Sequence, residues 1–246
     1  MISNRILDIF YPPRCVICET VISAEKGHVC ESCRGKLSYV EEPRCYKCGK
    51  EIESPDEEYC SDCSEKERSY VCGFPVFNYV SPISDSIMRL KYGGRQESAK
   101  FFAEEIFIKY GRQFKELGID IIVPVPVHRK KYITRGYNQA ELIAAELGRL
   151  MGLPVDPGLI IRVHDTKPQK KLDNLMRENN LKSAFKPGII NIEKKDIRNK
   201  NVEDLKILLV DDIYTTGATI EACTRVCRSM GIADVYFTSV AIGTGQ

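Results

Sequence analysis

The chain contains the sequence Ile207-Leu208-Leu209-Val210-Asp211-Asp212-Ile213-Tyr214-Thr215-Thr216-Gly217-Ala218-Thr219. Its first residues are all apolar and are typical of a buried strand, which would deliver two adjacent carboxylates to its carboxyl edge. A short loop of small and hydroxyl residues follows, and a helix is predicted to begin near Thr219. Free N–H groups at a helix N-terminus, with threonine hydroxyls beside them, form a binding site for an anion.

The two carboxylates restrict which anion this loop would hold. Asp211 and Asp212 would repel a phosphate group, but they suit the hydroxyl groups of a sugar diol one step away. The pattern therefore predicts a ribose 5-phosphate, with its diol on the two acids and its phosphate on Thr215, Thr216, Gly217, Ala218 and Thr219. The competing interpretation is an ordinary strand end followed by a helix cap. The chain has no G-x4-G-K-[ST] loop, which disfavours a nucleotide triphosphatase.

Apolar segments alternate with amphipathic ones along the rest of the chain after residue 72. We predict strands at residues 74–80, 119–127, 207–211 and 235–242, and helices at 84–92, 97–110, 139–150 and 219–230. This order is typical of an α/β fold in which helices flank a mostly parallel sheet. In such folds a ligand binds at the carboxyl ends of the strands.

Eight of the 11 cysteines form four C-x2-C pairs before residue 73, and eleven residues separate each pair from the next. Two such pairs can surround one zinc ion with four thiolates, so we predict two structural zinc sites rather than disulfides. The ligands would be Cys15, Cys18, Cys30, Cys33, Cys45, Cys48, Cys60 and Cys63. Sequential pairing is the simplest arrangement, and a cross-paired one stays open. Gly49, directly after Cys48, suits the tight turn of such a site.

The charge divides between two predicted domains, a small double zinc-ribbon domain at residues 1–70 and a larger α/β domain at residues 71–246. Residues 1–72 carry 10 basic and 14 acidic residues, whereas residues 123–186 carry 12 basic and 6 acidic ones. The acidic ribbons are poorly suited to DNA and favour a scaffold or protein-contact role. Neither a secretory signal nor an apolar run long enough for a membrane span is evident, so we expect a cytoplasmic protein.

Three segments together resemble a known family. The segment at 207–219 resembles the phosphoribosyl pyrophosphate signature of type I phosphoribosyltransferases, which the ComF family shares. The other two segments resemble the ComF family itself, which also carries an N-terminal double zinc ribbon. They are Val123-Pro124-Val125-Pro126 with Arg135-Gly136-Tyr137-Asn138-Gln139, and Gln169-x2-Leu172-x4-Arg177-x2-Asn180-x3-Ala184-Phe185.

This resemblance implies a site for phosphoribosyl pyrophosphate with Mg²⁺. Asp211, Asp212 and Arg135 would be the catalytic residues, and backbone N–H groups of the turn at 123–127 would bind pyrophosphate. A mobile basic loop near 165–177 would close over the substrate. Besides the loop at 215–219, the substrate-binding residues would be Val125, Pro126, Asn138, Gln139, Lys167, Gln169 and Arg177. If the resemblance is set aside, the basic segments are equally typical of a charged surface exposed to solvent, and Asn138 is equally typical of a helix N-cap.

The resemblance also implies a role in natural competence or DNA uptake, beside helicase-like and single-stranded DNA-handling proteins. Three functions stay open at this point. The first is transfer of ribose 5-phosphate to an acceptor that the sequence does not specify. The second is an adaptor that binds phosphoribosyl pyrophosphate without turnover. The third is direct binding of single-stranded DNA, because Tyr132 and Tyr137 lie among basic residues and could stack on bases, although we expect at least one of them to pack in the core.

Overall fold

A four-stranded parallel sheet forms the centre of the protein. The computed structural model describes residues 12–23, 27–164, 183–189 and 200–244. The strands lie in the order β1-β6-β5-β2 and comprise Gly73–Asn78 (β1), Asp234–Ile242 (β6), Lys206–Tyr214 (β5) and Ile121–Pro124 (β2). Their apolar residues are buried on both faces, as parallel sheets require. The predicted mostly parallel α/β fold is confirmed.

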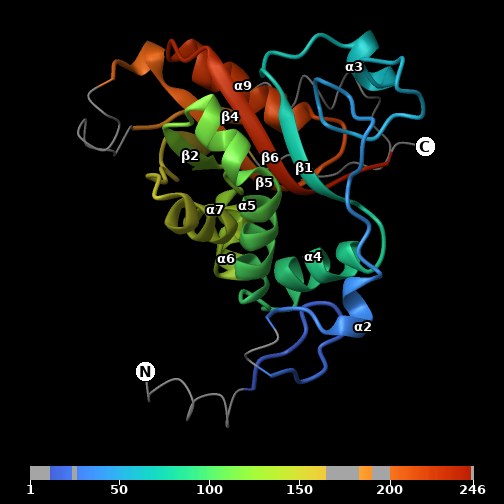
Figure 1. Cartoon of the computed structure of the whole chain (residues 1–246). Coiled ribbons are helices and arrows are strands. Elements are labelled where there is room, and N and C mark those ends of the chain that lie inside the picture. Colours follow the sequence, from blue (N-terminus) through green and yellow to red (C-terminus); the bar gives the residue numbers. More distant parts are fainter. Residues whose placement is uncertain (1–11, 24–26, 165–182, 190–199, 245–246) are drawn as a thin grey trace.

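Helices cover both faces of this sheet (Figure 1). On one face lie α5 (Ser98–Leu117) and α7 (Gln139–Met151), preceded by α4 (Ile83–Tyr92) and α6 (Arg129–Arg135). On the other lies α9 (Ala218–Ser229), which also contacts a short antiparallel pair. This pair joins β3 (Ile160–Arg162) and β4 (Phe185–Pro187), and a 3-10 helix (Val202–Asp204) precedes β5.

Some elements differ in length from the sequence prediction. Helix α5 continues beyond its predicted end to Leu117, where Gly118 adopts φ 71° and ends it. Strand β2 is shorter than predicted because two prolines at its end cannot donate hydrogen bonds to a sheet. Helix α6 and the pair β3–β4 are too short to give a clear periodic pattern. Among the described residues, no helix combines the length and the apolar character that crossing a membrane requires.

The cysteine repeats pack into two different hydrophobic cores. Cys15 and Cys33 belong to the core beneath α5 and α7, whereas Cys45, Cys48 and Cys60 belong to the core beneath α9. In Figure 1, α2 (Glu31–Arg34) of the first repeat lies below α4, and α3 (Ser61–Glu65) of the second lies near the opposite end of β1. Both cores therefore contain residues from either side of the division that we predict at residue 70.

The linker between the two repeats covers the outer edge of β1. Val40 N–H donates to Val76 O at 2.9 Å, and Asn78 N–H donates to Ser38 O at 2.9 Å. Lys109 of α5 donates to both Val40 O and Val76 O, and burial together with the Arg44 charge lowers the pKa of Lys109 to about 8. The strand at the edge of the sheet is thus paired on both sides.

Candidate functional site

Two cysteine clusters fit two structural zinc sites. Cys15, Cys18, Cys30 and Cys33 form one cluster and Cys45, Cys48, Cys60 and Cys63 the other, with all sulfur atoms of a cluster within 4.8 Å of one another. The Cys18 and Cys30 sulfurs lie 3.7 Å apart, and those of Cys48 and Cys60 lie 3.6 Å apart. Four sulfurs at about 2.3 Å from a zinc ion are separated by roughly 3.8 Å in a tetrahedron. The structure therefore selects the sequential arrangement of ligands.

The two ribbons repeat the same backbone turn. Glu19 N–H donates to Cys15 O at 2.8 Å, and Gly49 N–H donates to Cys45 O at 2.9 Å. Both residues that follow the first pair of a ribbon are left-handed, with φ 61° at Glu19 and 77° at Gly49. The internal repeat of the sequence is thus a repeat of structure as well.

Asp211 and Asp212 lie near the carboxyl end of β5, but they face different neighbours. Asp212 Oδ1 forms a 2.9 Å ion pair with Lys91 Nζ of α4, and its Oδ2 atom is buried without a hydrogen-bond partner in the described chain. Asp211 Oδ1 accepts a hydrogen bond from Asp212 N–H at 2.8 Å. Burial, followed by repulsion from Asp212, raises the pKa of Asp211 to about 7, although Lys91 and Arg162 of β3 oppose this.

The loop after β5 has the form of an anion site. Gly217 adopts φ 74° and starts α9, and a Cβ atom there would collide with the Tyr214 hydroxyl, so only glycine fits. Glu221 N–H donates to Gly217 O at 2.8 Å, which makes it the first intrahelical bond. The N–H groups of the three preceding residues consequently have no partner within the helix. Thr215 and Thr216 are exposed, and Ala218 and Thr219 are half-buried.

Three of the predicted site residues form a brace between helices. The Arg135 guanidinium lies 4.7 Å from the centre of the Tyr92 ring and donates to Gln139 Oε1 at 2.9 Å. Asn138 caps α7 by accepting from Ala140 N–H, and its Nδ2 donates to Val125 O at 3.0 Å. The N-cap interpretation of Asn138 is therefore correct, and the same side chain also supports the turn after β2.

One sequence expectation needs correction at this turn. The Val125 N–H group was expected to face pyrophosphate, but it donates to Val210 O at 2.9 Å because β2 and β5 stay paired to this point. Pro126, which has no N–H group, is half-buried. Of the two tyrosines considered for stacking, Tyr137 is the one that packs in the core: it is buried and its hydroxyl donates to Leu90 O. Lys167, Gln169 and Arg177 lie outside the described residues.

Two residues near this site were missed by sequence reasoning. Lys91 occupies the last turn of α4, where a cation is commonly explained by the helix dipole. Only the three-dimensional structure reveals its pairing with Asp212. Arg68 lies between the second ribbon and β1, in a segment without any motif, yet its Nη2 donates to Thr216 O at 2.8 Å.

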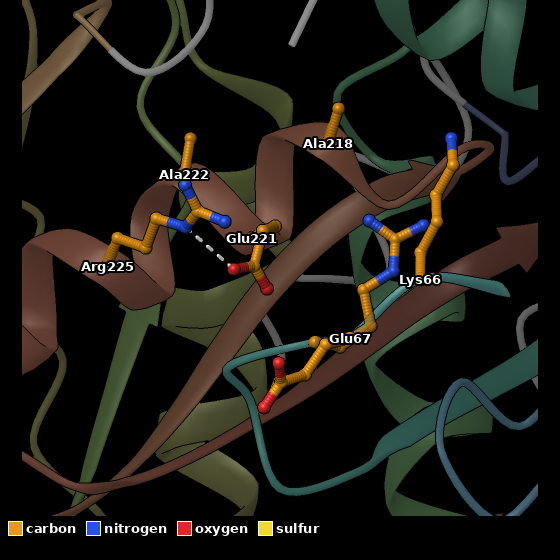
Figure 2. Close-up of a pocket in the computed structure, with 7 residues that line it drawn as sticks. Lys66, Glu67, Ala218, Glu221, Ala222 and Arg225 are labelled. Atoms are coloured by element: carbon orange, nitrogen blue, oxygen red, sulfur yellow. Dashed lines mark hydrogen bonds and ion pairs between the residues drawn. The ribbon is translucent and has the colours of Figure 1, made fainter. Parts of the chain in front are cut away.

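A pocket lies beside the start of α9, between this helix and the segment at residues 66–68 (Figure 2). Its volume is about 240 Å³, and it shares Ala218 with the predicted phosphate loop. Figure 2 shows the Glu221–Arg225 ion pair on one wall, with a distance of 2.8 Å, and Lys66 and Glu67 on the other. The pocket thus brings the segment after the second ribbon next to the first turn of α9.

Comparison with known proteins extends over most of the chain. The model of the double zinc ribbon domain family matches residues 6–64. Competence protein F of Haemophilus influenzae is 26% identical over 94% of this chain and 98% of its own length. The DNA utilization protein YhgH of Salmonella typhimurium is 27% identical over 91% of this chain and 94% of its own. Competence protein ComFC of Bacillus subtilis is 27% identical over 83% of this chain and 80% of its own.

Among solved structures, a hypoxanthine phosphoribosyltransferase from Staphylococcus aureus covers 58% of this chain and 62% of its own. Its identity is 13% and its TM-score 0.30, a similarity too low to assign the fold. The sequence comparisons are much more extensive. They confirm the resemblance to the ComF family, because competence protein F, ComFC and YhgH are homologues of this chain over most of its length.

Proposed function

We propose that this protein binds phosphoribosyl pyrophosphate with Mg²⁺ and transfers ribose 5-phosphate to an acceptor during the uptake or use of external DNA. The names of the homologues, which refer to competence and DNA utilization, support the cellular role. The proposal places the protein in the cytoplasm, beside helicase-like and single-stranded DNA-handling partners.

The buried Oδ2 atom of Asp212 carries the ligand proposal. Buried polar atoms are almost always hydrogen-bonded, and this one has no partner among the residues that the structure describes. A sugar hydroxyl or a Mg²⁺ ion would supply the missing partner, since both suit a carboxylate oxygen. The phosphate loop begins three residues later, so diol and phosphate contacts lie in one short segment.

The residues of the site have distinct proposed tasks. Asp211 and Asp212 would hold the diol, and the N–H groups at the start of α9 would hold the 5-phosphate. The 2.9 Å ion pair with Lys91 holds the Asp212 carboxylate in place before a ligand arrives. When bound, Mg²⁺ would neutralise charge on the departing pyrophosphate. The basic residues of α6, Arg129 to Lys131, lie after the turn at the end of β2 and would add positive charge there.

Calorimetric titration of zinc-loaded protein with phosphoribosyl pyrophosphate and Mg²⁺ tests the proposal. We expect saturable binding that Asp211→Asn weakens at least about tenfold. Asp204→Asn is the matched control, because Asp204 is exposed on the 3-10 helix. Absence of binding by folded wild-type protein would refute the ligand. Binding without pyrophosphate release, tested with candidate acceptors, would support the adaptor function instead of transfer.

A second function, binding of single-stranded DNA, is favoured by the surface around α6. Tyr132 is 48% exposed beside Arg129, Lys130 and Lys131, and Tyr92 is 68% exposed under the Arg135 guanidinium. Exposed aromatic rings among cations are typical of surfaces that stack bases and neutralise phosphates.

Fluorescence anisotropy with an oligo-dT probe tests this second function. Tyr132→Ala should weaken binding about fivefold to tenfold, because stacking contributes roughly 1–3 kcal/mol per base. Tyr59→Ala is the matched control, since Tyr59 is 46% exposed but lies in the acidic second ribbon. Equal losses in the two variants, or affinity that does not fall with salt, would contradict DNA binding by this surface.

A further inference from the structure

Three consecutive residues after the second ribbon contact the phosphate loop or the residues that flank it on either side. Tyr70 OH and Tyr214 OH share a hydrogen bond of 2.8 Å just before the loop. Arg68 Nη2 donates to Thr216 O within the loop. Ser69 donates from its N–H and its hydroxyl to the Glu221 carboxylate, both at 2.7 Å, just after the loop.

These contacts are well buried. Tyr70 is fully buried and meets the Phe237 ring edge-on at 5.0 Å, while Tyr214 stacks on the same ring at 4.9 Å. Arg68 is 8% exposed, although it carries a full charge. Burial opposes the charge on Glu221, but the bonds from Ser69 and the Arg225 ion pair lower the pKa of Glu221, so it stays ionised. Such bonds are costly to break, because their partners would be left unsatisfied.

The bond from Arg68 also determines where the loop directs an N–H group. In a trans peptide the C=O of one residue and the N–H of the next point in opposite directions. Because Arg68 holds Thr216 O on its own side, the Gly217 N–H is directed away from Arg68. The Tyr214 hydroxyl packs against the position of the missing Gly217 side chain and so fixes the other side of the turn. Fixed N–H groups bind an anion more tightly than mobile ones, since no ordering cost remains.

The first ribbon has different attachments. Its Val16 O accepts from Ser86 and Arg89 at 3.0 Å each, and its Ile17 O accepts from Arg89 at 2.7 Å. Both donors belong to α4, on the other side of the sheet from α9. In the part of the chain that the structure describes, it is thus the segment after the second ribbon, and not the first ribbon, that bonds to the phosphate loop.

We propose that Arg68, Ser69 and Tyr70 are positioning residues that fix the phosphate loop, so that the second ribbon controls the affinity for the phosphorylated ligand. This inference rests on the proposed function, because it concerns the same loop. It adds a structural link from the second ribbon to the N–H groups of the loop, through the short segment that follows Cys63.

Two arginines that flank the second ribbon allow a matched test. Arg44 precedes Cys45 and donates to Tyr110 OH of α5 at 2.8 Å, whereas Arg68 follows Cys63 and donates to the loop. Arg68→Met should weaken phosphoribosyl pyrophosphate binding about tenfold, and Arg44→Met should change it less than about twofold. Arg68→Lys should restore part of the affinity. Equal losses in the two methionine variants would overturn the proposal.

Amide hydrogen exchange gives a readout that needs no ligand. Arg68→Met should speed exchange at Glu221, whose N–H donates to Gly217 O, at least about tenfold, while the amides of β6 stay unchanged and Arg44→Met leaves the exchange at Glu221 as in the wild type. Ser69→Ala, a milder change, serves if Arg68→Met does not fold, and it should speed exchange in the same region. Unchanged exchange at the Glu221 amide in the Arg68 or Ser69 variant would refute the positioning role. If the wild type bound no ligand but the loop responded in this way, the function would fail and the positioning role would stand.

Discussion

The two ribbons share their cysteine spacing and their turns, but they are buried to different extents. In the first ribbon Cys18 is exposed and Cys30 half-buried, whereas Cys45, Cys48 and Cys60 of the second are buried. The first ribbon is held by α4, and the second is followed by the segment that contacts the phosphate loop. A repeated sequence therefore produces a repeated local structure, while the surroundings of each copy decide what that structure supports.

The turn that follows the first cysteine pair of each ribbon, here called its knuckle, contains Glu19 in the first ribbon and Gly49 in the second, and these two residues illustrate the difference. Both are left-handed, which costs a residue with a side chain about 1 kcal/mol. The first knuckle tolerates a side chain, and Glu19 uses it for a 2.7 Å ion pair with Arg95. At Gly49 a Cβ atom would lie 2.7 Å from Gly73 O and would also strike the Pro75 ring. Close packing against β1 thus requires glycine in the second ribbon.

The largest expected effect comes from removing one ligand of each ribbon. Cys48→Ser should lower the free energy of unfolding by about 4 kcal/mol or more, because it removes zinc from a site within the core. Cys18→Ser should remove about one zinc equivalent as well, but with less than half of that loss. Zinc analysis and thermal unfolding by circular dichroism measure both. A similar loss of stability in the two variants would mean that the two zinc sites contribute equally to stability despite their different burial.

The knuckle of the second ribbon gives the next effect. Gly49→Ala should lower the free energy of unfolding by about 3 kcal/mol, since a backbone clash adds to the strain of the left-handed conformation. Gly27→Ala is the matched control, because Gly27 has φ 76° but no atom within 4 Å of the added Cβ. Gly27→Ala should lower the free energy of unfolding by only about 1 kcal/mol. Urea unfolding at constant zinc content provides the measurement, and equal costs would mean that packing against β1 is unimportant.

The third prediction concerns how the free energy of unfolding of the core that holds the second ribbon depends on pH. Asp211 acts electrostatically on Cys223, which belongs to that core. The folded pKa of Asp211, about 7, lies above its ordinary value of 3.8, so its contribution to stability is lost as pH rises through 7. Asp211→Asn should therefore be more stable than wild type by about 1–2 kcal/mol at about pH 8, and the difference should shrink towards about pH 5.

Thermal unfolding of both proteins over this pH range would measure the effect. Asp204→Asn, on the exposed 3-10 helix, should follow the wild type throughout. A difference between Asp211→Asn and wild type that grows as pH falls would have the wrong sign and would reject the raised pKa.

The smallest expected change in stability is for a substitution at the knuckle of the first ribbon. Glu19→Gly relieves the left-handed strain but loses an exposed ion pair worth about 0.5 kcal/mol, so a net gain of about 0.5 kcal/mol is expected. High salt should enlarge the gain slightly, because it weakens the ion pair in the wild type. A loss of stability in Glu19→Gly would show that the side chain does more in the first ribbon than the pair with Arg95.

Much of this arrangement follows from local sequence. The apolar run before Asp211 predicts a buried strand, and regular cysteine spacing predicts two metal clusters, because both depend on residues close in the chain. The ion pair between Lys91 and Asp212 could not be predicted, since it depends on how α4 packs against the end of β5. The contact of Arg68 with the loop could not be predicted for the same reason, because its partner Thr216 is distant in sequence. That one of Tyr132 and Tyr137 packs in the core could be expected, but the sequence does not show that it is Tyr137, because this depends on how the segment packs.

The linker that pairs with β1 has a consequence for how the chain is made. Residues 38–40 precede β1, so a ribosome synthesises the cover before it synthesises the edge strand. An uncovered edge strand is a template on which another nascent copy could add a strand. The linker is therefore available for the outer edge of β1 as soon as this strand emerges, whereas the inner edge waits for β6, which is synthesised last. The order of segments along the chain thus allows the outer edge of the sheet to be covered early in synthesis.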